Sequence, residues 1–181
     1  ENAIAIQADV TERAEVDQMV KVAKEHFGNI DIVINNALVN FKFDPNQQKN
    51  FKDLTWEDYQ QQLDGTLKAA FNVTQSVIPQ FIEKQEGRII NISSKAAHNS
   101  MPILQFYSAS KAMARLITEG FRYELRTSNS HTIVIISPGL VSPDLVDDTH
   151  FDVAKERQAL VTKDVAQLCS VDSQDTTLSG H

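Results

Sequence analysis

The sequence is poor in several residue types, and each shortage excludes a class of protein. A single cysteine, Cys169, cannot form an internal disulfide, so the reducing cytoplasm is the expected location. The 6 glycines do not combine into a Gly-rich phosphate loop. No apolar run approaches the roughly 18 residues of a membrane span. Acidic residues outnumber basic ones by 24 to 17, which disfavours nucleic acid as a partner, because phosphate binding requires clustered cations.

The chain does contain short apolar runs that are typical of parallel strands buried on both faces. They are rich in Ile and Val and nearly continuous rather than alternating. These predicted strands cover residues 3–7, 30–35, 88–93 and 132–137.

Helical patterns lie between the predicted strands. The first covers residues 11–27, with Thr11 as its expected N-cap. The second covers residues 55–83 and starts with a capping box of Thr55 and Asp58, and the third covers residues 106–126. Strands that alternate with helices indicate right-handed βαβ units. The expected fold is therefore a single α/β domain over residues 1–181, a Rossmann-like doubly wound parallel sheet.

A tyrosine and a lysine four residues apart carry the strongest chemical signal. Tyr107 and Lys111 occur at the start of a predicted helix, where this spacing places both side chains on one face. An ammonium group beside a phenol favours the phenolate, so Lys111 is expected to lower the pKa of Tyr107. Such a tyrosine acts as a general acid or base near neutral pH. Taken alone, the spacing occurs by chance on many solvated helices.

The pair is not alone, because small polar or turn residues follow every predicted strand. In open α/β sheets, ligands bind at the carboxyl ends of the strands. A serine there can hydrogen-bond a substrate carbonyl, although serine also favours ordinary turns. The residues in question are Asp9, Asn35, Asn36, Ala37, Ser93, Ser94, Pro138 and Gly139.

In this order and spacing, these motifs resemble the short-chain dehydrogenase/reductase family. The similarity is nearest to the β-ketoacyl-acyl-carrier-protein reductase type and extends over residues 3–180. It implies an NAD(P)(H)-dependent oxidoreductase that interconverts a carbonyl and a secondary alcohol, with 3-oxoacyl thioesters as one substrate class. The cofactor is NADP or NAD, with NADPH slightly favoured. Dimers or tetramers are common in the family.

The resemblance also assigns roles to individual residues. Tyr107 is the expected proton donor, Lys111 holds the nicotinamide ribose, and Ser94, rather than Ser93, orients the carbonyl. Thr66 aligns with an asparagine that supports a proton-relay water. The residues expected to contact the cofactor are Asp9 and Val10 at the adenine, Asn36 and Ala37 below the ribose, Tyr107 and Lys111, and Pro138, Gly139 and Val141 at the nicotinamide.

The sequence departs from the family pattern in several places. Leu38 replaces a glycine, Thr66 replaces the relay asparagine, and Pro143 replaces a threonine. The strand and Gly-rich turn with which the family begins are missing, as is the closing strand, so the domain is expected to be incomplete at both ends.

Two other functions remain open. One is a non-catalytic binding or scaffold protein that retains the fold, and the other is an isomerase or dehydratase acting on nucleotide sugars. No metal site is expected, since His98, His131 and His150 lack metal-like spacing. Small-molecule substrates and a homo-oligomeric partner are expected, but no nucleic acid or membrane.

Overall fold

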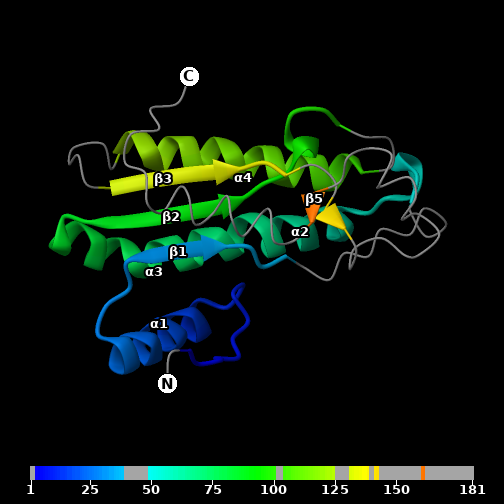
Figure 1. Ribbon diagram of the computed structural model, residues 1–181. Helices are drawn as coiled ribbons and strands as arrows, with labels where there is room; N and C mark the ends of the chain where they lie inside the picture. Colours follow the sequence, from blue (N-terminus) through cyan, green and yellow to red (C-terminus); the bar gives the residue numbers. More distant parts are fainter. Residues whose placement is uncertain are drawn as a thin grey trace.

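The computed structural model describes residues 3–38, 49–100, 104–124, 131–138, 141–142 and 160–161. A parallel sheet forms its centre, in the order β1-β2-β3 (Figure 1). Its strands are β1 (Ile32–Asn35), β2 (Gly87–Ile92) and β3 (His131–Ile136). A separate parallel pair consists of β4 (Val141–Ser142) and β5 (Leu160–Val161). The three apolar runs that form the sheet were all predicted as strands, to within two residues at each end.

The helices occupy the segments between these strands. The longer ones are α1 (Arg13–Phe27), α2 (Trp56–Leu63), α3 (Ala69–Lys84) and α4 (Gln105–Glu124). Short helical segments are η1 (Phe51–Asp53), the π-helical η2 (Asp64–Lys68) and η3 (Lys95–Ala97).

The segment predicted as one long helix over residues 55–83 is the continuous run α2–η2–α3. The capping box is confirmed: the Asp58 amide donates to Thr55 Oγ1 at 3.3 Å, and the Thr55 amide donates to Asp58 Oδ2 at 2.9 Å. The π-helical turn η2 contains Gly65 and Thr66, both buried. Such turns widen a helix locally and are frequent at functional sites.

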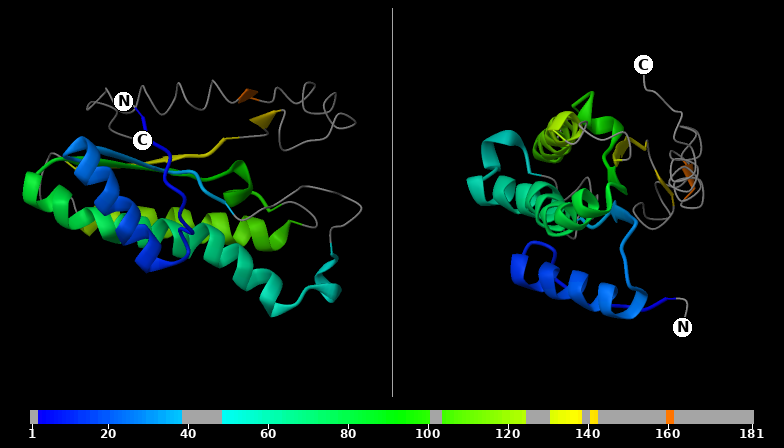
Figure 2. Two further views of the ribbon diagram at one scale, coloured as in Figure 1. Left: turned by 90° about the horizontal axis from the view of Figure 1, so that it is seen from below. Right: turned by 90° about the vertical axis from the view of Figure 1, so that its left-hand side faces the viewer.

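Helices α3 and α4 lie side by side on one face of the sheet (Figure 2). Helix α1 lies beyond the β1 edge and packs against α3 (Figure 2). No helix in the described part of the chain is both long and apolar enough to cross a membrane.

Apolar side chains from α3 and the sheet form the core between these layers. Val77 and Phe81 of α3 pack with Ile89 of β2 and Ile133 of β3. Full burial of each such side chain stabilises the fold by about 1.5–3 kcal/mol. This packing fixes the position of α3 along the strand direction of the sheet. Because η2 directly precedes α3, it is thereby placed near the carboxyl ends of the strands.

A series of hydrogen bonds between partly buried amides and the buried Thr118 hydroxyl connects the sheet to α4. Asn35 and Asn91 are register partners on β1 and β2, and Asn35 Nδ2 donates to Asn91 Oδ1 at 2.7 Å. Asn91 Nδ2 donates to Thr118 Oγ1 on α4 at 2.7 Å, and Thr118 donates to the Ala114 carbonyl at 2.6 Å. Polar groups whose hydrogen bonds are satisfied in this way hold one arrangement of their elements. The series of hydrogen bonds therefore connects β1 and β2 to α4.

Two local predictions were wrong. Residues 3–7 are not a strand, because no strand lies beside them in the described part of the chain and a strand requires a neighbour for its hydrogen bonds. Thr11 does not cap α1, because its hydroxyl donates instead to Asp9 Oδ1 at 2.8 Å. Glu12 occupies the cap position and makes no side-chain bond there.

Candidate active site

The first turns of α4 carry Tyr107 and Lys111. Only 5% of Lys111 is exposed, and its Nζ donates to the Ile92 carbonyl at the end of β2 at 2.9 Å. The same Nζ lies 5.9 Å from the centroid of the Tyr107 ring. The ammonium is therefore held between the tip of the central strand and the phenol.

Ser94 reaches the same place from the loop that follows β2. Its Oγ caps η3 by accepting from the Ala96 amide at 3.1 Å, and its side chain hydrogen-bonds Tyr107. The neighbouring Ser93 is buried, and its Oγ donates to the Lys111 carbonyl at 3.5 Å. Ser94 thus contacts the tyrosine, whereas Ser93 attaches the strand end to α4.

Backbone hydrogen bonds bring the end of β3 to this loop. The Ser93 amide donates to the Ile136 carbonyl at 2.7 Å, and the Lys95 amide donates to the Pro138 carbonyl at 2.9 Å. These bonds continue the parallel pairing beyond the last ladder residues. Pro138 consequently lies beside the Ser94 loop, as expected for strands that end at one edge of a sheet.

Burial dominates the electrostatics of the tyrosine and the lysine. It raises the pKa of Tyr107, and the hydrogen bond from Ser94 offsets part of that rise. It also lowers the pKa of Lys111 to about 8. The expectation that Lys111 depresses the tyrosine pKa is therefore not met, because a site that excludes water favours the neutral form of both groups.

A cavity of about 410 Å³ adjoins this cluster and has a mostly apolar lining. Its volume lies in the range of small-molecule sites, roughly 300–1,000 Å³. The cavity extends from α1 and α3 along β1 to Lys111. The predicted site residues in its lining are Val10, Asn36, Ala37, Thr66 and Lys111.

The remaining predicted residues lie elsewhere. Four of them are described but are outside the cavity lining: Ser94, Tyr107, Pro138 and Asp9, which is next to Val10 in the turn before α1. Gly139 and Pro143 fall outside the described residues, and only the backbone of Val141, in β4, is described. In the described ranges, no cluster of His, Cys, Asp and Glu has the composition of a metal site.

Two polar residues near the site were given no role by the sequence analysis. Asn72 and Asn91 are asparagines within otherwise apolar stretches, and both make hydrogen bonds between elements. Their positions could have revealed them. A polar residue on the apolar face of a helix or within an apolar strand needs a hydrogen-bond partner from another element.

Comparison with known proteins agrees with this geometry. The family profile described as short chain dehydrogenase matches residues 1–153. The chain belongs to the short-chain dehydrogenase family. Its parallel sheet and the helices that cover it are thus those of a short-chain dehydrogenase with the Rossmann-like fold.

Individual relatives are moderately similar. An uncharacterized oxidoreductase of Staphylococcus epidermidis is 29% identical over 154 residues, which are 85% of this chain and 64% of that protein. Another from Staphylococcus aureus is 30% identical over 167 residues, which are 90% of this chain and 66% of that protein. This short-chain dehydrogenase chain therefore spans slightly less than two thirds of the length of these relatives.

Solved structures show the same arrangement. Serine dehydrogenase from Escherichia coli superposes with a TM-score of 0.74 at 27% identity, covering 95% of this chain and 68% of that one. A closed form of serine dehydrogenase complexed with NADP+ gives 0.78 at 27% identity, covering 92% and 68%.

The residues around the cavity fit a nicotinamide dinucleotide. Lys111 supplies a buried ammonium as a donor to hydroxyl groups, and the buried Thr66 Oγ1 has no hydrogen-bond partner in the described part of the chain. The apolar lining suits the flat faces of the ligand rings.

The burial of Lys111 predicts a pH-dependent stability. The unfolded lysine keeps its proton up to its ordinary pKa of 10.5, whereas the folded one loses it near 8. Between these values the unfolded state binds more protons, so the free energy of unfolding should increase with pH, by up to about 1.4 kcal/mol per unit. Urea unfolding of wild type and Lys111→Met between about pH 7 and 10 measures this. A constant difference between the two proteins would contradict the burial of the charge.

Proposed function

We propose that this chain carries the catalytic groups of an NAD(P)(H)-dependent oxidoreductase that interconverts a carbonyl and a secondary alcohol. The observation that carries the proposal is the hydrogen-bonded pair of Ser94 and Tyr107 with the Lys111 ammonium beside the phenol ring. Ser94 comes from the loop after β2, and Tyr107 and Lys111 come from the first turns of α4. The hydrogen bond from Lys111 to the Ile92 carbonyl holds these two segments together.

The chemistry of the three side chains follows from their contacts. In reduction, the Tyr107 hydroxyl donates a proton to the substrate oxygen, and Ser94 hydrogen-bonds that oxygen. The Lys111 charge stabilises the phenolate that remains. The bound cofactor supplies or accepts the hydride. A raised Tyr107 pKa keeps the hydroxyl protonated at neutral pH, which is the form that an acid requires.

Four residues of the cavity lining, Val10, Asn36, Ala37 and Lys111, support a set of cofactor contacts that extends to neighbouring residues. We assign Lys111 and Tyr107 to the nicotinamide ribose, Asn36 and Ala37 to the segment below it, and Asp9 and Val10 to the adenine. Pro138, Gly139 and Val141 are assigned to the nicotinamide by family resemblance. The proposed cofactor is NADP or NAD, with NADPH slightly favoured by the family resemblance; similar structures hold NADP+ and NAD+.

Thr66 supports a water site near the lysine. Its hydroxyl is buried, has no partner among the described residues and lines the same cavity as Lys111. We propose that it binds a water that exchanges protons with the Lys111 ammonium, in place of the family asparagine. A buried water requires two to four polar partners, and Thr66 is one of them.

The substrate is a small carbonyl or alcohol compound. Names of similar proteins suggest a test panel of serine, gluconate and xylitol, each with its keto form, to which a 3-oxoacyl thioester is added because of the family resemblance. A cytoplasmic location remains a prediction from the single cysteine.

Replacing Tyr107 by Phe tests the proposed acid. Turnover on any active member of the panel should fall by at least about a hundredfold, since general acid catalysis contributes roughly 10²–10⁴. Cofactor affinity, measured by fluorescence titration, should change by less than about threefold because the ring remains. Tyr123→Phe is the matched control, on the same helix but 71% exposed, and should be fully active. Turnover retained in Tyr107→Phe would overturn the assignment, and wild type inactive with every substrate would favour a scaffold.

The outer face of α4 supports self-association. Exposed apolar side chains recur along one stripe of this helix: Met113, Leu116, Ile117 and Tyr123. Soluble monomers seldom expose such contiguous patches. We propose that a second copy of the chain covers this stripe, as in the oligomers common in the family.

A charge on this stripe should weaken the oligomer. Leu116 is 56% exposed, so Leu116→Asp leaves the monomer core intact while placing a carboxylate in the proposed interface. Sedimentation velocity should show a shift from the wild-type dimer or tetramer to monomer. Phe27→Asp on α1, where Phe27 is 49% exposed, is the control and should keep the wild-type state. A monomeric wild type, or an unchanged Leu116→Asp, would contradict the proposal.

A further inference from the structure

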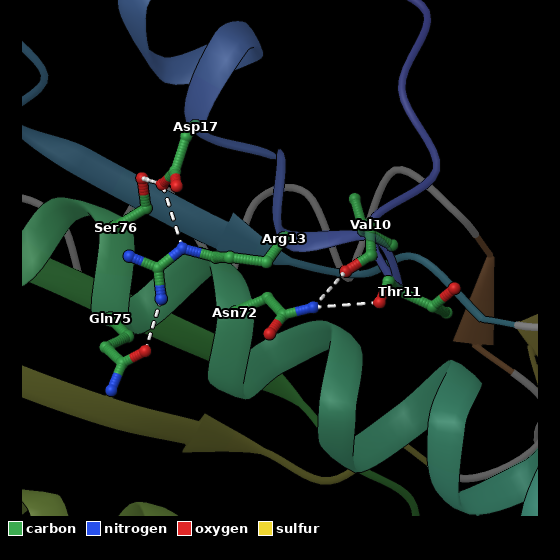
Figure 3. A network of polar contacts seen from close by, with 7 residues as sticks. All are labelled: Val10, Thr11, Arg13, Asp17, Asn72, Gln75 and Ser76. Carbon is green, nitrogen blue, oxygen red and sulfur yellow. Dashed lines mark hydrogen bonds and ion pairs between the residues drawn. The ribbon is translucent and has the colours of Figure 1, made fainter. Parts of the chain in front are cut away.

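Asn72 connects α3 to the turn that precedes α1. Its side chain is only 5% exposed, and its Nδ2 donates to two main-chain carbonyls, those of Val10 and Thr11, each at 3.1 Å (Figure 3). Both hydrogens of the amide group are thus donated, each to the carbonyl of one of two consecutive residues in the turn. Figure 3 shows the Asn72 amide reaching from α3 to both carbonyls.

The other hydrogen bonds of this turn are local. Asp9 Oδ1 accepts from the Thr11 amide at 2.9 Å and from the Thr11 hydroxyl at 2.8 Å. The Asp9 amide donates to Glu15 Oε2 at 2.7 Å. These bonds give the turn its shape but do not fix its position relative to α3.

Further contacts between α1 and α3 are more exposed. Asp17 Oδ1 accepts from Ser76 at 2.7 Å and from Arg13 at 2.9 Å, and Arg13 also donates to Gln75 (Figure 3). Exposed charged contacts contribute little to stability. A buried amide bound to carbonyls contributes more, because breaking it leaves the carbonyls without partners. Asn72 is therefore the contact best placed to hold the turn.

The turn adjoins the proposed cofactor site. Val10 lines the cavity, and both local bonds of the Asp9 carboxylate fall on Oδ1. Oδ2 makes no hydrogen bond or ion pair with the described residues and can accept a hydrogen bond from an exocyclic amine. Small displacements of a positioning contact are costly because binding groups must be held within fractions of an ångström.

We propose that Asn72 is a positioning residue that sets the affinity for the adenine end of the cofactor by holding the backbone of residues 9–11 against α3. This inference rests on the proposed function, since Asp9 and Val10 are adenine contacts only if a nicotinamide dinucleotide binds. An amide is required: a carboxylate at this position would face two carbonyl oxygens without a hydrogen to donate.

The test compares Asn72→Asp, the milder Asn72→Ser and the control Ser76→Ala, which removes a bond between the same two helices away from the turn. The first measurement is amide hydrogen exchange of residues 9–12 without cofactor. Both Asn72 variants should exchange at least about tenfold faster there, as expected for loss of buried hydrogen bonds, and Ser76→Ala should match wild type. Unchanged exchange in folded Asn72→Ser would overturn the positioning role.

The second measurement is the Kd for NADP and NAD by calorimetry. Both Asn72 variants should bind at least about tenfold more weakly, while kcat at saturating cofactor should stay within about twofold of wild type, because the reacting groups are unchanged. Faster exchange with an unchanged Kd would overturn the link to the cofactor. A wild type that binds neither dinucleotide would refute the proposed function itself, while the exchange data would still decide whether Asn72 holds the turn.

Discussion

The parallel pairing of β1, β2 and β3 is the constraint on which the whole site depends. It brings the ends of three strands to one edge, where the Lys95 amide binds the Pro138 carbonyl and Lys111 Nζ binds the Ile92 carbonyl. The hydrogen bonds of Lys111 Nζ to Ile92 and of Ser93 to the Lys111 carbonyl attach the first turns of α4 to the end of β2, beside Ser94. The Asn35–Asn91–Thr118 hydrogen bonds also depend on the register, since the first of them joins two register partners.

Burial of side chains is the second factor that shapes the site. It stabilises the fold, but it disfavours the charged forms of titratable groups. Apolar contacts between α3 and the sheet stabilise the fold. At the site, burial withdraws Lys111 fully and Tyr107 partly from water. Both groups are thereby shifted toward their neutral forms. The hydrogen bond from Ser94 opposes this shift at the tyrosine. The pKa of Tyr107 thus results from a balance between desolvation and the hydrogen bond from Ser94.

Much of the fold was predictable because its signals are local. Apolar runs of Ile and Val gave β1, β2 and β3, and the Thr55–Asp58 capping box gave the start of α2. The failures involve long-range effects. Residues 3–7 have the composition of a strand, but strand formation depends on a neighbour that no local pattern reveals. The pKa of Tyr107 depends on how deeply the ring is buried, and the role of Asn72 depends on a turn that lies 62 residues away along the chain.

The most direct test of the site is the titration of the Tyr107 hydroxyl, isolated as the ultraviolet difference between wild type and Tyr107→Phe. Burial places the wild-type midpoint above the ordinary tyrosine value of about 10. Ser94→Ala should move it higher still, because the bond that favours the phenolate is lost while burial remains. A wild-type midpoint below about 10, or a midpoint unaffected by Ser94→Ala, would contradict the pairing of Ser94 and Tyr107 on which the proposed chemistry depends.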